Sequence, residues 1–174
     1  MKPIVIDASA AAAWVMPDEV SDAALRMYAE ATQPNDVFHA PSLWVWETGN
    51  ILVMGRARGR VDDDQIERAQ ALLAATNISF DPVPSLHRRA QIGRMAQAHG
   101  LTFYDASYLE LVLRLNGQLA SLDKKLVAAA RACGIVCLWA FLLSWEWGSG
   151  KEGDDRIRGR VLSGALHNDR ARDA

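Results

Sequence analysis

Residues 3 to 9 read Pro-Ile-Val-Ile-Asp-Ala-Ser, and this stretch decides the fold class of the chain. Ile4, Val5 and Ile6 form a β-branched run without polar alternation, which is typical of a short strand buried on both faces of a parallel sheet. Asp7 ends the run, just before an alanine-rich, helix-prone segment. Open α/β sheets bind their ligands at this carboxyl edge. Asp7 is therefore a candidate site residue, although Asp in this position also commonly caps the next helix.

Short apolar segments alternate with longer amphipathic segments along the rest of the chain. The sequence predicts further strands at 37–40, 78–83, 118–122 and 135–138, and helices at 10–16, 18–31, 43–53, 65–75, 85–99, 106–115 and 124–132. This alternation favours βαβ units, in which the strands are parallel and helices cover both faces of the sheet. The expected fold class is α/β.

Composition places the chain among soluble globular proteins. Of its 174 residues 50% are hydrophobic and 23% are charged, which allows one domain with a substantial core. We expect that domain at 1–140 and a flexible C-terminal extension at 141–174, where charged and small residues dominate. The net charge of −2 is not that of a protein that binds nucleic acid mainly by neutralising phosphates. A phosphate ligand would need a local basic patch or a bridging metal ion.

Cysteine content and hydropathy indicate the compartment. Cys133 and Cys137 have no His partner at metal-ligand spacing, so we interpret both as buried thiols in a reducing environment. The longest apolar run, 135–143, is well short of the roughly 20 residues that span a membrane. We therefore expect a cytoplasmic protein without membrane contact.

Four acidic residues stand where the predicted fold brings segments together. Asp7 and Asp123 each end a predicted strand, and parallel strands end at the same edge of a sheet. Asp105 follows a loop that leads into a helix, and Glu47 lies in a mainly apolar helix, where a buried acid needs a partner. The alternative, four unrelated capping or solvated acids, stays open on spacing alone.

A shared pocket of carboxylates implies a cation. Carboxylates that lie close together raise one another's pKa unless positive charge is present. Mg²⁺ or Mn²⁺ prefers oxygen ligands, and none of the four positions is His, Cys or Lys, so zinc and Schiff-base chemistry fit poorly. The run Asp62-Asp63-Asp64 is interpreted instead as a helix start, which acidic side chains favour.

Four motifs occur in order between residue 3 and about residue 138. They are Val-Ile-Asp-Ala-Ser at 5–9, Pro-Ser-Leu-Trp-Val-Trp-Glu-Thr-Gly-Asn-Ile-Leu at 41–52, Gly-Leu-Thr-Phe-Tyr-Asp-Ala-Ser-Tyr-Leu at 100–109 and Leu-Ala-Ser-Leu-Asp-Lys-Lys-Leu at 119–126. Together they resemble the PIN domain family and, more narrowly, the VapC-type toxins of bacterial toxin–antitoxin pairs. The resemblance implies a PIN-like three-layer α/β/α sandwich with a short central parallel sheet.

The resemblance also implies roles for particular residues. The family's acids fall on Asp7, Glu47, Asp105 and Asp123, as catalytic residues and ligands of Mg²⁺, with Mn²⁺ as a substitute. Ser9 and Ser121 match positions where a hydroxyl supports the acids, and Ser121 stands where Thr is frequent. The implied activity is Mg²⁺-dependent endoribonuclease. The extension after residue 140 departs from typical single-domain members.

Partners follow from the same resemblance. It implies an RNA substrate, a cognate antitoxin protein, a homodimer, and contact with DNA only through the antitoxin. From the residues themselves, Arg56, Arg58 and Arg60 are candidate RNA contacts, although each also suits an ordinary solvated helix face. Trp44 and Trp46 lie in apolar context and are expected in the core.

Two other functions remain open at this point. One is a catalytically silent PIN-like module for protein interaction, against which the presence of all four acids speaks. The other is a different Mg²⁺-dependent phosphohydrolase with Asp7 as nucleophile. That scheme usually needs a second Asp two residues later, where this chain has Ser9.

Overall fold

A four-stranded sheet lies at the centre of the protein. The structure is a computed structural model and describes residues 2–138. Its strands are β1 (Ile4–Ile6), β2 (Phe38–Pro41), β3 (Ser79–Asp81) and β4 (Gln118–Ala120). They are arranged in the order β3-β2-β1-β4, and each neighbouring pair is parallel. The predicted α/β class with a short parallel sheet is confirmed, and all four strands end at one edge.

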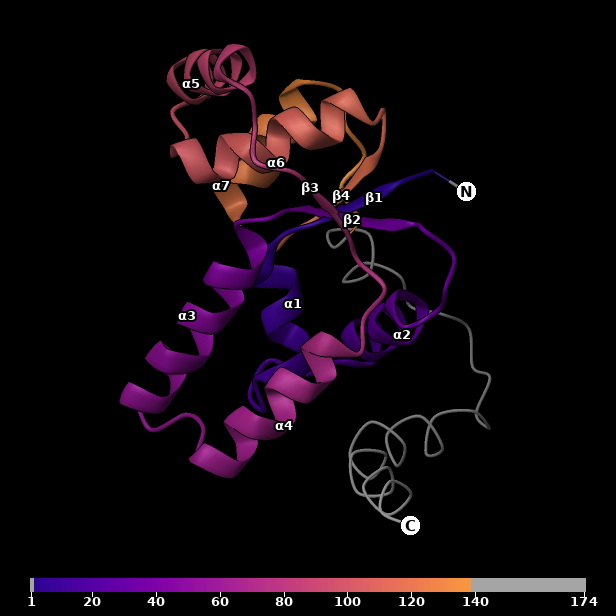
Figure 1. Cartoon of the computed structure of the whole chain (residues 1–174), viewed down its shortest axis with the longest axis vertical. Helices are drawn as coiled ribbons and strands as arrows, with labels where there is room; N and C mark the ends of the chain where they lie inside the picture. Colours follow the sequence, from indigo (N-terminus) through magenta and orange to yellow (C-terminus); the bar gives the residue numbers. More distant parts are fainter. Residues whose placement is uncertain (1, 139–174) are drawn as a thin grey trace.

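Helices cover both faces of this sheet (Figure 1). One layer contains α1 (Ala8–Val15), α2 (Asp22–Ala31), α3 (Trp44–Ala57) and α4 (Asp63–Ala74), and the other contains α5 (Leu86–His99), α6 (Phe103–Arg114) and α7 (Lys124–Ala132). The three-layer α/β/α sandwich is therefore confirmed. Within residues 2–138, none of these helices combines the length and the apolar character that a membrane crossing requires.

The core forms where the central strand is buried from both sides. Val5 and Ile6 of β1 are fully buried, as are Tyr108 and Leu109 of α6. Burying one large apolar side chain contributes about 1.5–3 kcal/mol. On the opposite face the alanine-rich α1 contacts α2, α3 and α4, because its small side chains allow the neighbouring helices to approach closely. This packing fixes the residue that links β1 to α1, which is Asp7.

Capping residues decide where the helices begin. Ser21 caps α2 and accepts a hydrogen bond from the Ala24 N–H, so this helix begins at 22 and not at 18. Thr102 caps α6 in the same way through the Asp105 N–H, and α6 begins three residues before its predicted start. Asp105 therefore lies inside the first turn of a helix and does not precede it.

Three predicted strands are shorter in the structure, and β3 covers only Ser79–Asp81 of the expected 78–83. β4 ends at Ala120 and not at 122, because the chain then turns so that Asp123 caps α7. Segment 135–138 contributes only an isolated bridge between Leu119 and Cys137. The expected extension at 141–174, and the domain boundary at 140, lie outside the described residues.

The expected burial of Trp46 is wrong. Its residue surface is 80% exposed, whereas that of Trp44 is 3% exposed. Both residues lie in the first turn of α3, and positions two apart on a helix point about 200° away from each other. Only one of the two side chains can therefore face the core.

Candidate active site

The first site residue is fixed by the register between β1 and β4. Ile6 pairs with Ala120, so Asp7 and Ser121 are the residues that directly follow the last paired position on each strand. The Ser121 hydroxyl donates a 2.7 Å hydrogen bond to Asp7 Oδ2, across 114 positions of sequence. The Ser9 hydroxyl donates to the same oxygen at 2.5 Å. Both serine hydroxyls thus contact the first acid, which agrees with the supporting hydroxyls that the family resemblance implies.

Asp7 occupies the N-cap position of α1 without acting as a side-chain cap. Its backbone is extended, and its carboxylate accepts hydrogen bonds from the Ser9 and Ser121 hydroxyls, so capping of α1 does not account for its contacts. The residue is only 7% exposed. Burial raises the pKa of Asp7 above its usual range, hydrogen bonds from Ser121 and Ser9 oppose this effect, and the charge of Asp105 adds to it. A buried carboxylate of this kind gains stability from a nearby cation.

Glu47 projects from the first turn of α3 toward the same centre. Burial raises the pKa of Glu47 to about 6, and the negative charges of Asp7 and Asp105 contribute further. The Tyr108 hydroxyl donates a 2.5 Å hydrogen bond to Glu47 Oε2 and acts in the opposite direction. Glu47 therefore exchanges its proton close to neutral pH, which suits a general base.

Asp105 completes the group of acids that interact through their charges. It lies in the first turn of α6, where the Thr102 hydroxyl donates a 2.7 Å hydrogen bond to its Oδ2. Its charge acts on both Asp7 and Glu47. Three of the four predicted acids, one directly after β1 and the others in α3 and α6, thus share one electrostatic environment at the edge where the strands end.

Asp123 has a different environment from the other three. It is exposed, and its Oδ1 accepts 2.8 Å hydrogen bonds from the backbone N–H groups of Lys125 and Leu126, which caps α7. Its own N–H donates to the Ser121 hydroxyl at 3.0 Å. Ser121 thus links the backbone of Asp123 to the Asp7 carboxylate, while Oδ1 of Asp123 caps α7.

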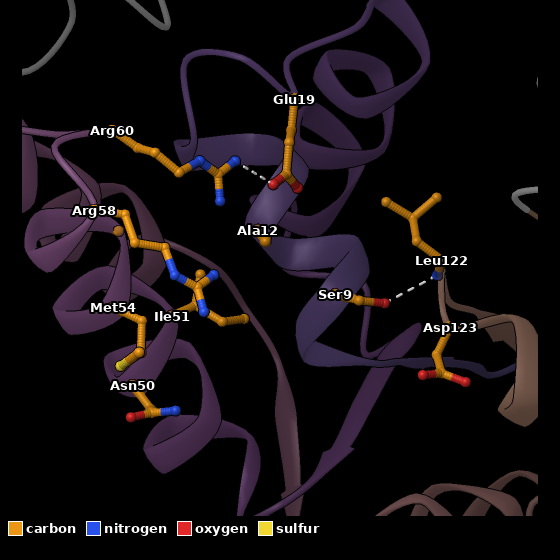
Figure 2. A pocket seen from close by; sticks show the side chains of 11 residues that line it. Ser9, Ala12, Glu19, Asn50, Ile51, Met54, Arg58, Arg60, Leu122 and Asp123 are labelled. Carbon is orange, nitrogen blue, oxygen red and sulfur yellow. Dashed lines mark hydrogen bonds and ion pairs between the residues drawn. The ribbon is translucent and has the colours of Figure 1, made fainter.

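The three predicted RNA-contacting arginines differ in whether they form ion pairs. Arg56 forms an ion pair with Asp63 at 2.7 Å, and Arg60 forms ion pairs with Asp18 and Glu19. Among the described residues Arg58 forms no ion pair. Arg58 and Arg60 line a cavity of about 480 Å³ that also reaches Ser9 and Asp123 (Figure 2).

Sequence reasoning missed two side chains that hold the acids in place. Tyr108 reads as an ordinary core residue of an apolar helix, yet its hydroxyl contacts Glu47. Thr102 reads as part of a loop, yet it both caps α6 and contacts the Asp105 carboxylate. The available signals were the Thr102-to-Asp105 spacing of a helix cap, and the three-residue spacing from Asp105 to Tyr108, which places both on one helix face.

The donor set is of the kind that hard cations prefer. Carboxylates and hydroxyls supply oxygen only, and Asp7, Glu47 and Asp105 repel one another in a partly buried setting. Within residues 2–138, no three His, Cys, Asp or Glu side chains are grouped closely enough to hold one metal ion jointly. Mg²⁺ itself commonly uses one or two protein carboxylates and keeps several waters. The residues therefore fit such a cation by their chemistry.

The fold and the acids at the strand edge define the class of protein. The family model described as PIN domain matches residues 4–132, so the chain belongs to the PIN domain family. The family expected from the four motifs is thereby confirmed.

Individual relatives narrow the comparison. The chain is 31% identical over 127 residues to Ribonuclease VapC3 of Pyrobaculum aerophilum, which covers 71% of this chain and 91% of that protein. The structure of the present chain is similar to the crystal structure of PAE2754 from Pyrobaculum aerophilum, with a TM-score of 0.60 and 25% sequence identity. The match covers 82% of this chain and 88% of that one. The narrower resemblance to VapC proteins is thus also confirmed.

Proposed function

We propose that this protein is a Mg²⁺-dependent endoribonuclease that hydrolyses RNA phosphodiester bonds. The observation that carries the proposal is the buried Asp7 carboxylate at the carboxyl edge of the sheet, which the Ser9 and Ser121 hydroxyls hold and whose pKa the charge of Asp105 helps to raise. The similarity to a protein named Ribonuclease VapC3 supports RNA as the substrate. Asp7, Asp105 and Asp123 would hold the cation, with Mn²⁺ as a substitute, and Glu47 would bind it or orient a water.

The chain's own residues divide the work. Asp7 is held by the two serine hydroxyls, which keep its carboxylate oriented toward the site. Glu47, whose pKa burial raises to about 6, would bind the cation or orient the attacking water. When bound, a divalent cation neutralises charge on the phosphate and lowers the pKa of a water. Because water is the nucleophile, the RNA 2′-hydroxyl takes no part in the chemistry, and the product retains a 5′-phosphate.

The biological role that fits this activity is that of a toxin. We propose that the protein acts on cytoplasmic RNA as a homodimer and that a cognate antitoxin protein inhibits it. Contact with promoter DNA would occur only through that antitoxin. Similarity to a VapC protein supports this role. Expression of the chain alone should arrest growth, and co-expression of the small protein encoded by the neighbouring gene should relieve the arrest.

The direct test is cleavage of a structured RNA by the purified protein, with Mg²⁺ or with EDTA. The wild-type chain should cleave with Mg²⁺ and be inactive in EDTA, and Asp7→Asn should lose at least a hundredfold in rate because it removes a buried carboxylate of the site. Asp64→Asn, at an exposed helix start, is the matched control and should retain full rate. Thermal melting of each variant checks that it folds.

Three outcomes would contradict the proposal. Cleavage that persists in EDTA would show that the reaction needs no divalent cation. Full activity in Asp7→Asn would show that the reaction does not use this carboxylate. A folded, metal-binding protein that cleaves no RNA would favour the interaction-module alternative.

A further inference from the structure

The cavity between α1 and α3 opens beside the acids. Its volume of about 480 Å³ lies within the range of pockets that bind small ligands. Its lining comes from α1 and the segment that follows it, from α3 and the segment that follows it, and from the turn before α7. The cavity is thus built by the elements that begin at the carboxyl edge of the sheet.

One side chain belongs both to the cavity and to the acid site. The Ser9 hydroxyl donates to Asp7 Oδ2 at 2.5 Å and accepts a 2.9 Å hydrogen bond from the Leu122 N–H. Ser9 and Leu122 both line the cavity, and Figure 2 shows their hydrogen bond at its wall. Ser9 therefore lies between the Asp7 carboxylate and the cavity, so the cavity directly adjoins the acid site.

The cavity is lined by two arginines, Arg58 and Arg60, and by two acids, Glu19 and Asp123. Arg60 is held by Asp18 and Glu19 at 2.8 Å and 2.5 Å. Arg58 is exposed and forms no ion pair among residues 2–138, and Figure 2 shows its guanidinium extending into the space that faces Ser9 and Asp123. A guanidinium presents several N–H donors in a planar fork that matches the oxygens of a phosphate.

The remaining lining suits the other parts of a nucleotide. Met54 and Leu122 present partly exposed apolar surface, on which a base can lie. Asn50 supplies an amide that can both donate and accept hydrogen bonds. A cationic fork, apolar surface and an amide in one cavity together match a phosphate joined to a nucleoside.

We propose that this cavity is a nucleotide subsite of the nuclease, in which Arg58 binds the phosphate next to the scissile one and the base lies against Met54 and Leu122. The inference rests on the proposed function, since it assumes that RNA reaches Asp7. RNA fits this cavity better than an acidic protein segment does. Within a polynucleotide, both a further phosphate and a base lie next to the scissile phosphate, and the cavity offers a contact for each.

The test measures steady-state cleavage of a short single-stranded RNA at several salt concentrations. Arg58→Gln should raise KM about tenfold with kcat within twofold, because the contact acts on binding and not on the reacting bond. The dependence of log KM on log salt should flatten by about 0.7, as expected for one lost phosphate contact on a single strand. Arg58→Lys should restore the salt dependence and only part of the affinity, since it keeps the charge without the fork.

Arg68→Gln is the matched control, because it removes the same charge from an exposed position of α4 outside the cavity. It should leave KM within twofold. If the wild-type enzyme cleaves RNA while Arg58→Gln and Arg68→Gln show the same KM and salt dependence, the subsite is overturned and the proposed function stands. If the wild-type protein cleaves no RNA in Mg²⁺, both are overturned.

Discussion

At the scale of single residues, the titration of Glu47 sets a pH dependence of stability. Burial raises the folded-state pKa of Glu47 to about 6 from 4.5, so the folded protein favours its protonated form. The contribution of Glu47 to the free energy of unfolding is fully present below pH 4.5 and is lost as the pH rises through 6. In EDTA, Glu47→Gln should therefore gain stability relative to wild type across this window, by about 1 kcal/mol after allowance for partial exposure.

Thermal melting by circular dichroism at pH 4, 5, 6 and 7 measures this difference. The melting temperatures of the two proteins should be closest at pH 4 and should diverge as the pH increases. A difference that does not change with pH would contradict the assigned environment of Glu47.

Tyr108 acts on the pKa of Glu47 in the opposite direction to burial. Its hydrogen bond favours ionised Glu47, so Tyr108→Phe should raise the pKa of Glu47 further. The acidic limb of the pH–rate profile should then move to higher pH. We expect about a tenfold loss of rate at pH 6 and less than a twofold loss at pH 8.

The control for this prediction is Tyr28→Phe. Tyr28 is also buried, and its hydroxyl donates to the Leu72 carbonyl at 3.0 Å, away from the acids. That variant should lose stability without a change in the midpoint of the profile. Equal shifts in both variants would mean that Tyr108 acts only through packing.

The sequence predicts where the candidate acids lie better than it predicts what surrounds them. A carboxylate directly after a buried strand, such as Asp7, is recognisable because strand ends meet at one edge. Whether Trp46 faces solvent, or whether Tyr108 reaches Glu47, depends on how far a helix is rotated about its axis, and a short apolar segment leaves that rotation undetermined.

At the scale of the elements, Asp123 has a structural role that differs from its proposed chemical role. Its Oδ1 caps α7 through two backbone N–H groups. Asp123→Ala should cost about 1 kcal/mol of stability, whereas Asp123→Ser should be nearly neutral because Ser also caps helices well. If the carboxylate also holds the cation, both variants should lose at least tenfold in RNA cleavage.

Chemical denaturation and cleavage assays of the two variants separate these roles. A stable Asp123→Ser protein with full activity would show that Asp123 serves only as a helix cap.

Element boundaries could be predicted only where capping residues are unambiguous. α7 begins and ends as predicted, because Asp123 caps it and Gly134 follows its end with φ 78°. α6 was placed too late, because the apolar periodicity begins after Asp105 while the cap, Thr102, lies earlier. Since the first turn of α6 carries Asp105, this boundary decides where the acid lies.

At the scale of the whole molecule, the parallel sheet brings four distant segments to one edge. The general α/β pattern predicts that edge, but the neighbours of each strand come from tertiary packing. The pairing of β1 with β4 joins Asp7 to Ser121, and the ion pair between Arg60 and Asp18 joins residues 42 positions apart. The separation of Arg58 from Arg56 and Arg60 depends on such contacts, which the sequence does not show.

The central claim is that the acids at this edge share a divalent cation. Anomalous diffraction from crystals soaked in Mn²⁺ tests it most directly. We predict a manganese peak next to Asp7 and within reach of the Asp105 or Glu47 carboxylates, and no peak there in crystals of Asp7→Asn. If lattice contacts leave this edge accessible and crystals soaked in saturating Mn²⁺ show no peak there, the claim is contradicted.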